Sequence, residues 1–403
     1  MSSTHLKPTA ITAEALRLLH NTCPFIANID KQHDKQTTFG GQKRGSTLSI
    51  RLPNKYTVRR TWTINTQDVT ERKVDLVIGQ VFGADMMFEE ADLALEINEF
   101  SKRFIKPAIN VIASSIDSYC LGEAYKAVWS SVGTPGTTPN TAQVYLDGAA
   151  KMDNYAVPQE DRVALISPLT NAKTVGSLLS LFNPTKNIAK QYISGQMGEA
   201  LGYSYYKTQN IPRHTCGSRS GTILINDAGA ANATQGSTTI SVNGLGGATQ
   251  TFAAGDVFTV GSVYAVNDET KVSTGELQQF VVTTLATGSG SAVSLTVSPA
   301  MYTTGAMQNI DAFPLHGAAV TVVGTASTQY PQNLLYYPEA FTFATANLEM
   351  PSDVTFKAQT SVDGINMRIL RQFNINNSSY PTRIDVFGGF LAQRPEMACR
   401  LWG

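Results

Sequence analysis

The stretch INEFSKRFIKPAINVIASSID, residues 97–117, constrains the fold more than any other part of the sequence. Apolar side chains recur in and around it every three to four residues, which is the spacing of one face of an α-helix. The positions are Leu93, Ile97, Phe100, Phe104, Ala108, Val111, Ile116 and Tyr119. Proline has no backbone N–H, so Pro107 either kinks this helix or lies in its first turn. From Pro107 to Trp129 alone the helix would measure roughly 35 Å, which predicts a spine for other elements.

The segment before this helix is strongly basic. Residues 35–60 contain no acidic side chain and seven basic ones: Lys35, Lys43, Arg44, Arg51, Lys55, Arg59 and Arg60. Apolar and polar residues alternate at 48–52 and again at 74–78, and a period of two predicts strands. About twenty residues separate these strands, which is long for a hairpin loop inside a compact domain. We therefore expect a projecting two-stranded loop.

Regular elements of both kinds follow the long helix. After a loop rich in Gly, Thr and Pro, the patterns predict a helix at 142–153, a strand at 162–167 and a second helix at 171–182. Near the N-terminus, residues 12–21 predict one short helix in an arm. This mixture of elements indicates an α+β core.

A change of composition marks residues 221–328 as a separate segment. Six short β-type runs, TILIN, TTISVN, VFTVG, FVVTTL, VSLTVS and AVTVVG, are separated there by Gly, Asn or Asp. Residues 220–330 carry six acidic and one basic side chain, whereas residues 1–219 carry 24 basic and 19 acidic ones. We expect an all-β barrel or sandwich inserted into a discontinuous α+β domain, which the last seventy or so residues complete.

Overall composition limits the classes of protein. The 403 residues have 31 basic and 31 acidic side chains, and 42% are hydrophobic, enough to bury a sizeable core. No run of 18 apolar residues and no charged segment leading into an apolar one occurs, so we expect neither a membrane span nor a secretory signal. Four cysteines and five histidines are scattered without metal-ligand spacing, which predicts free thiols and no metal or cofactor.

The sequence offers no catalytic constellation. Gly40 and Gly45 have phosphate-loop spacing, but Ser46 and Thr47 follow where a Lys is needed, so a flexible loop is the better interpretation. The glycines around Gly244 are interpreted as turn residues. The acidic cluster at 85–99 has no basic catalytic partner, and no G-x-S-x-G elbow is present. We expect a protein that is not an enzyme.

The order of these elements and four local sequences resemble one family. The sequences are INEFSKRFIKPAINVIASSID (97–117), GEALGYSYYKTQNIPRHTCG (198–217), NLLYYPEAFTFATANLEMP (333–351) and RIDVFGGFLAQRPEMACRL (383–401). They look like parts of the major capsid proteins of tailed phages with the Hong Kong 97-type fold, in particular the coat proteins of short-tailed phages. Each motif encodes packing, not chemistry, but together they span nearly the whole chain.

The resemblance implies a domain organisation and a set of partners. It implies an N-terminal arm (1–34), an extended loop (35–82), a spine helix and peripheral domain with part of the axial domain (83–220), the inserted all-β domain (221–328) and the rest of the axial domain (329–403). It further implies pentamers and hexamers of the chain in an icosahedral virion shell, assembled in the host cytoplasm. A scaffolding protein, a portal protein and packaged double-stranded DNA are the implied partners, and no membrane is involved.

Charge suggests which residues make these contacts. We expect the loop residues Lys43, Arg44, Arg51, Arg59 and Arg60 to meet an acidic patch on a neighbouring subunit, formed by Asp85, Glu89, Glu90 and Asp92. Lys102, Arg103 and Lys106 are candidates for weak, non-specific contact with DNA, or equally for pairing with nearby glutamates. Some members of the fold form an isopeptide bond from a loop lysine; Lys43 and Lys55 lie in the right region, but ion pairing is favoured.

A second interpretation belongs to another class of protein. The β-rich segment would also suit a phage tail or adhesin protein that grips a receptor. That alternative leaves the spine helix and the basic loop without a role, so the coat subunit is the leading hypothesis.

Overall fold

The computed structural model describes residues 23–31, 47–64, 66, 71–89, 106–178, 198–227, 234–247, 249–288, 292–354, 356–362, 365–375 and 379–403. The chain divides into two compact units. Unit 1 comprises Met1–Arg51, Lys73–Leu121 and Phe341–Gln393, and unit 2 comprises Leu52–Arg72, Gly122–Ala340 and Arg394–Gly403. The helix expected at 12–21 lies outside the described residues. Within the described part, no helix is both long and apolar enough to span a membrane.

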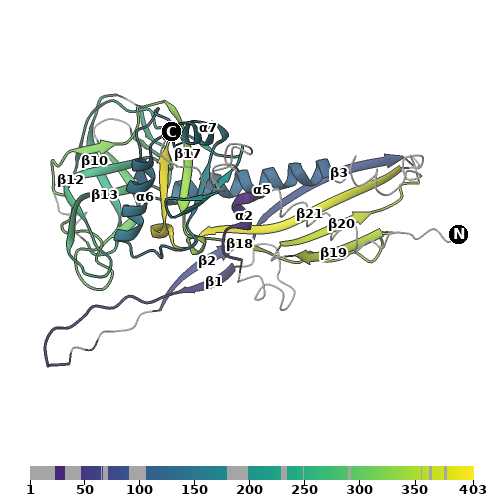
Figure 1. Ribbon diagram of the computed structural model, residues 1–403, viewed down its shortest axis with the longest axis horizontal. Helices are drawn as coiled ribbons and strands as arrows, with labels where there is room; N and C mark the ends of the chain where they lie inside the picture. Colours follow the sequence, from purple (N-terminus) through teal and green to yellow (C-terminus); the bar gives the residue numbers. More distant parts are fainter. Residues whose placement is uncertain are drawn as a thin grey trace. The chain divides into compact units, whose positions relative to one another are not determined.

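Unit 1 is built around one long strand, β21 (Ser379–Ala392). It belongs to a five-stranded sheet with the order β18-β21-β20-β19, in which β3 also pairs with β21. The partners are β18 (Phe341–Thr345), β20 (Ile365–Arg371), β19 (Phe356–Val362) and β3 (Gln80–Glu89). β3 follows β21 antiparallel over ten residue pairs, from Gln80 opposite Gly388 to Glu89 opposite Ser379. Residues far apart in sequence thus form one extended ribbon (Figure 1).

The predicted spine helix is α5 (Lys106–Ala127), and Pro107 is its second residue, where a missing N–H costs nothing. In unit 1 it lies along β3, and the rings of Phe82 and Tyr119 are 5.6 Å apart. The sequence interpretation put Val111 on the buried stripe, but its side chain is 67% exposed. The buried face carries Ile109, Ile112, Ala113, Ile116 and Cys120. These spacings of three and four form a more continuous apolar face than the expected one.

The expected two-stranded element is present as β1 (Thr47–Leu52) paired with β2 (Arg72–Val77). Side chains of both strands and of Ile78, which follows β2, form a small apolar cluster with residues in and next to β18 and on β21: Leu48, Ile50, Leu76, Ile78, Ala344, Ala346 and Phe387. This cluster fixes the base from which the loop leaves the sheet.

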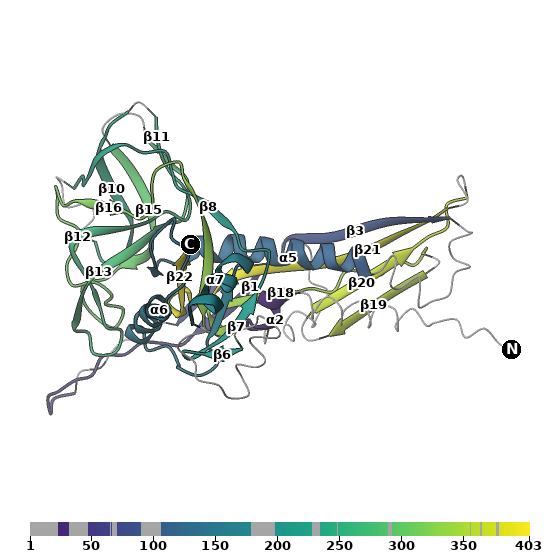
Figure 2. The same ribbon diagram turned by 45° about the horizontal axis from the view of Figure 1, so that its top comes forward.

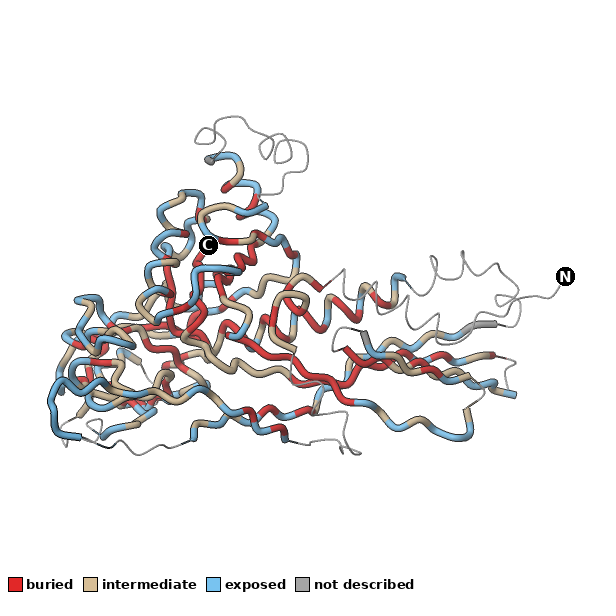
Figure 3. The backbone as a smooth tube through the Cα atoms, turned by 60° about the horizontal axis from the view of Figure 1, so that its bottom comes forward, coloured by how far each residue is buried: buried red, intermediate tan, exposed pale blue. Residues whose placement is uncertain are grey.

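Unit 2 contains a seven-stranded sheet with the order β4-β22-β17-β5-β7-β6, in which β8 also pairs with β17. The strands are β4 (Ser131–Val132), β22 (Ala398–Trp402), β17 (Gln329–Tyr336), β5 (Val163–Ile166), β7 (Tyr203–Lys207), β6 (Glu199–Ala200) and β8 (Arg213–Thr215). The same unit holds α6 (Ala142–Asn154), α7 (Pro168–Leu178) and two short 3₁₀ helices, η3 (Pro338–Ala340) and η4 (Pro395–Met397). The two helices and the strand predicted between 142 and 182 are confirmed. Buried residues gather along the strands of both units (Figure 3).

The inserted segment forms a six-stranded sheet with the order β16-β12-β13-β15-β10-β9 (Figure 2). The strands are β9 (Gly221–Ile225), β10 (Ser237–Leu245), β12 (Val257–Val266), β13 (Ser273–Val282), β15 (Ala292–Met301) and β16 (Val320–Val322). A β-bridge between Leu224 and Ala319, with a hydrogen bond from Ile225 N to Ala318 O (2.9 Å), brings the two edges together. Closure removes exposed edges, so the segment is a barrel.

All six strands predicted in this segment are confirmed, and two more were missed. These are β11 (Gln250–Phe252) and β14 (Ala286–Gly288), which pair with each other. The expectation that Gly244 is a turn residue is wrong, since it lies inside β10 with φ +78°, where the pairing register shifts. A Cβ there would fall 2.0 Å from the carbonyl oxygen of Thr222, so only glycine fits this bulge.

A buried carboxyl group lies between α5 and the short helix α2 (Pro24–Ala27). Asp117 has no exposed surface, and neither of its oxygens accepts a hydrogen bond of good geometry. Burial raises its pKa from the usual 3.8 to about 7, although the nearby backbone N–H groups of Ile26 and Phe25 partly offset this effect. Asp117 is therefore more readily protonated in the folded chain than in the unfolded one.

This shift predicts a stability that depends on pH. The pKa of Asp117 is higher in the folded chain than in the unfolded one. Its contribution to the free energy of unfolding is therefore fully present below about pH 4 and is lost as the pH rises through about 7. At about 1.4 kcal/mol for each pKa unit, the loss amounts to roughly 4 kcal/mol. Asp117→Asn should remove this decline and raise the free energy of unfolding at pH 8, measured in urea from pH 4 to 8. The exposed Asp147→Asn is the control; a decline of wild-type size in the Asp117 variant would contradict the interpretation.

Candidate functional site

The loop between β1 and β2 is the first candidate contact element (Figure 1). Arg59 and Arg60 lie on it and are exposed. Arg59 Nη1 donates to the carbonyl oxygens of Thr61 and Trp62 at 2.9 Å and of Thr63 at 2.6 Å. The guanidinium of Arg59 thus holds the shape of the loop itself, and Arg60 is the better probe of contacts outside the loop.

Three apolar side chains on the same loop are almost uncovered by the described part of the chain. Val58 is 86% exposed, Trp62 102% and Ile64 76%. Trp62 and Ile64 lie in the stretch TWTIN (61–65), which we interpreted from the sequence only as part of the connection between the two strands. A Trp and an Ile in an otherwise polar loop were the signal for a contact surface, because a monomer gains nothing from exposing them.

The acidic side of the expected contact is only partly described. Asp85 lies on β3 opposite Arg383 of β21, is exposed, and has its Oδ1 3.8 Å from Arg383 Nε. Arg383 Nε donates at 2.7 Å to Asp385, which is the closer partner. Among the described residues, the ion pair of Asp85 with Arg383 is therefore weak and solvent-exposed. Glu89 is the last residue of β3.

The remaining candidates are dispersed. Arg51 is exposed on β1, and Lys106 is exposed at the start of α5. The others lie outside the described residues: Lys43, Arg44, Glu90, Asp92, Lys102 and Arg103.

A second candidate site lies where the barrel joins the seven-stranded sheet. The chain enters the barrel from β8 and leaves it into β17, and these strands pair antiparallel, with Thr215 opposite Gln329 and Arg213 opposite Pro331. Cys216 N donates to Thr328 O, and Ser327 N donates to Cys216 O, so the ladder continues beyond the two strands. The two connections of the barrel therefore form one hydrogen-bonded neck.

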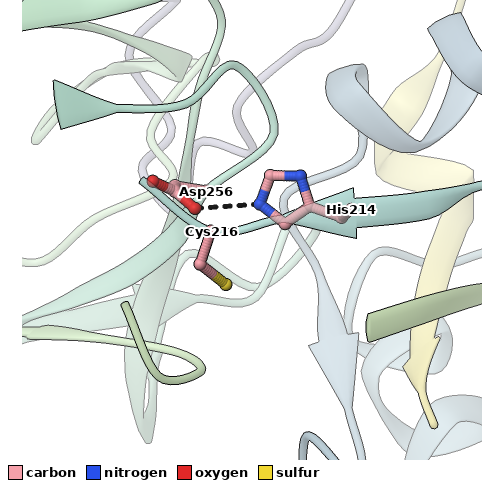
Figure 4. Close-up of side chains that lie close together, drawn as sticks. All are labelled: His214, Cys216 and Asp256. Carbon is pink, nitrogen blue, oxygen red and sulfur yellow. Dashed lines mark hydrogen bonds and ion pairs between the residues drawn. The ribbon is translucent and has the colours of Figure 1, made fainter. Parts of the chain in front are cut away.

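Asp256 is the centre of the polar cluster beside this neck (Figure 4). Its carboxylate is fully buried, and its Oδ1 lies 2.8 Å from His214 Nε2. Its Oδ2 accepts from Ala253 N at 2.9 Å, from Gly217 N at 3.1 Å and from Arg219 Nη1 at 3.3 Å. Four donors from both sides of the junction thus converge on one carboxylate.

Arg400 on β22 extends this cluster into the sheet. It is fully buried, and its Nη1 donates to Gly255 O at 2.6 Å while Nε and Nη2 donate to Gln332 Oε1 at 2.9 and 2.7 Å. Its guanidinium also lies 4.8 Å from the ring centre of Trp402. Burial lowers the pKa of Arg400 to about 10, so it still carries its charge at neutral pH.

His214, Cys216 and Asp256 lie close enough together to suggest a metal site, since one ligand atom of each falls within 4.8 Å of the others. Their hydrogen bonds favour a structural role. Burial lowers the pKa of His214, so its neutral ring can donate from Nε2 to Asp256, and burial raises the pKa of the Cys216 thiol. A cation would have to displace the guanidinium of Arg219 from the carboxylate. The cluster is suited to join the barrel to the sheet.

Sequence reasoning missed this cluster because its members are distant. The pattern His-Thr-Cys at 214–216 places His214 and Cys216 on the same face of a strand. Nothing in the sequence links them to Asp256, some forty residues later.

Comparison with solved structures finds chains from phages and from one virus-like particle. Similar chains include those of a structure described as Mycobacterium phage Che8 (10% identity, TM-score 0.47, 94% of this chain and 90% of that one). A second structure, described as the asymmetric unit of the bacteriophage PhiM1 mature capsid, has 9% identity and a TM-score of 0.42, with 91% of this chain and 83% of that one covered. A third, a virus-like particle from Pyrococcus furiosus, has 8% identity and a TM-score of 0.38, with 97% of each chain covered. A search of curated proteins finds no match.

The long helix α5, the long-stranded sheet of unit 1, the β1–β2 element and the barrel are the elements expected of a tailed-phage major capsid protein with the Hong Kong 97-type fold. The family model "P22 coat protein - gene protein 5" matches residues 14–403. The chain belongs to this family of coat proteins. It is therefore a structural protein and not an enzyme.

The junction generates a prediction about fragments of the chain. The barrel has its own apolar core, which includes Phe252, Phe258 and Phe280, so fragment 221–328 should fold. It lacks His214, Gly217 and Arg219, which leaves Asp256 without three of its donors. Fragment 213–331 retains them and should be more stable by roughly 3 kcal/mol in urea unfolding. Asp256→Asn should narrow the difference between the fragments; equal stability of the unmodified pair would contradict the role of the cluster.

Proposed function

We propose that the chain assembles as pentamers and hexamers that close an icosahedral phage head around double-stranded DNA. Membership of the coat protein family supports this proposal, and so does the loop, on which Trp62 is fully exposed. We further propose that assembly takes place in the host cytoplasm with a scaffolding protein and a portal protein. Family membership favours this function over a tail or adhesin protein.

In this proposal another copy of the chain covers the loop. A shell contains many copies, so an apolar surface that is uncovered in one subunit can be buried against the next. The basic residues Arg51 and Arg60, together with Lys43, Arg44 and Arg59, would then meet the acidic residues Asp85, Glu89, Glu90 and Asp92 of the neighbour. Each exposed pair contributes only about 0.2–1 kcal/mol. Because the same pair recurs at every subunit contact of a shell, the summed free energy of these pairs becomes large enough to influence assembly.

Trp62 offers a direct test of assembly. The other tryptophans, Trp129 and Trp402, are already 6% and 0% exposed, so a blue shift of tryptophan emission on assembly must come from Trp62. We expect wild-type subunits, mixed with scaffold, to show this shift while closed shells appear by electron microscopy. Arg60→Glu should raise the subunit concentration needed for shells severalfold, with salt narrowing the difference.

The conservative Arg60→Lys is the matched control, because it keeps the charge and should assemble as wild type does. Arg59 is left intact because its substitution would also disturb the loop. Normal shells from Arg60→Glu would contradict the charge contact, and shells without a blue shift would contradict the burial of Trp62.

We propose that Lys102, Arg103 and Lys106 attract packaged DNA without reading its sequence. Lys106 supports this by its exposure at the start of α5. Replacing all three with Gln should leave empty shells unchanged and lower only the DNA retained after packaging, measured by absorbance of purified heads. Loss of the shells themselves would instead show that these residues hold subunits together.

A further inference from the structure

An ion pair joins the base of the extended loop to the barrel within one chain. Lys55 Nζ lies 2.6 Å from Asp268 Oδ1, and the two side chains are 23% and 21% exposed. Lys55 follows β1 by only three residues, whereas Asp268 lies in the turn between β12 and β13. This contact links segments 213 residues apart in sequence. Its partial burial makes it stronger than an ordinary surface pair.

The turn that presents Asp268 is rigid. The side chain of Asn267 accepts hydrogen bonds from the backbone N–H groups of Glu269 and Thr270, both at 3.0 Å, and from Thr270 Oγ1 at 3.1 Å. Lys271 N donates to Asn267 O at 3.1 Å. Four hydrogen bonds within the five residues 267–271 hold the turn around the carboxylate, so little entropy is lost when Asp268 holds a partner.

The turn is also attached to the rest of unit 2. Asp268 N donates to Asn154 O at the end of α6 (3.4 Å). On the other side, Lys271 Nζ lies 3.3 Å from Asp268 Oδ1 and 3.3 Å from Gln308 O. The carboxylate of Asp268 thus contacts two ammonium groups, that of Lys271 in the same turn and that of Lys55 in the loop.

We propose that Asp268 is a latch that fixes the base of the extended loop on the barrel of its own chain, so that the barrel sets the direction in which the loop is offered to the neighbouring subunit. The loop is tied near its base, while Val58, Trp62 and Ile64 beyond the latch stay uncovered. This arrangement lowers the entropy cost of capture by a neighbour, because the loop is oriented before the subunits meet. The effect on assembly rests on the proposed shell function, but the latch itself does not.

Spin labels on the unassembled full-length chain can measure the latch. Val58→Cys on the loop and Leu285→Cys on the barrel are exposed at 86% and 67%, whereas all four native cysteines are buried, so labelling is selective. Pulsed electron paramagnetic resonance should give one narrow distance distribution. Asp268→Asn and Lys55→Met should each broaden it, and the double variant should be no broader than either single one.

Glu269→Gln is the matched control, because it removes the neighbouring exposed acid of the same turn and should leave the distribution narrow. Distributions as narrow as wild type in both Asp268→Asn and Lys55→Met would overturn the latch. So would a control that broadens as much as Asp268→Asn. In the same variants shell formation should slow severalfold; an unchanged rate beside a broadened distribution would overturn the role of the latch in assembly. A wild-type chain that forms no shells would refute the proposed function. The distance measurement would still show whether Asp268 and Lys55 fix the loop on the barrel.

Discussion

The burial of Asp256 is the constraint on which unit 2 depends. A carboxylate without access to water is costly unless its charge is compensated. Compensation comes from His214 and Arg219 on the incoming connection and from the backbone of the barrel itself. Arg400 adds a second buried charge that ties the barrel residue Gly255 to the sheet. The barrel therefore cannot move away from the sheet without leaving buried charges without partners.

Gly255 shows how tightly this arrangement is packed. Its φ is +99°, and a Cβ would fall 2.9 Å from the ring of Tyr125. A glycine is thus required twice over, for its backbone conformation and for the space it leaves beside α5. Trp129, Val257, Val281 and Trp402 belong to a buried apolar cluster that also contains Cys216, next to the polar cluster. Buried hydrogen bonds and apolar packing therefore both hold the barrel to the sheet at this junction.

Patterns with a short period could be predicted from the sequence, and contacts between distant residues could not. The six barrel strands follow from alternation, and α5 follows from its spacing of three and four residues. Even there Val111 was placed on the wrong face, because α5 has apolar residues on more than one side. His214, Asp256 and Arg400 meet only after folding, and no local pattern marks them as partners. The loop charges were recognised as a group, but the hydrogen bonds that set Arg59 apart from Arg60 depend on how the loop folds back on itself.

The paired neck of β8 and β17 has a consequence for modularity. Strands in an antiparallel pair keep opposite Cα atoms only about 5 Å apart, so the chain leaves the sheet and returns at almost one point. Any domain whose two ends lie that close together meets the geometric requirement for replacing the barrel. The neck is therefore a position at which one domain could replace another without disturbing the pairing of β8 with β17. Asp256 and Arg400 are the residues that fit the sheet to the barrel it now carries.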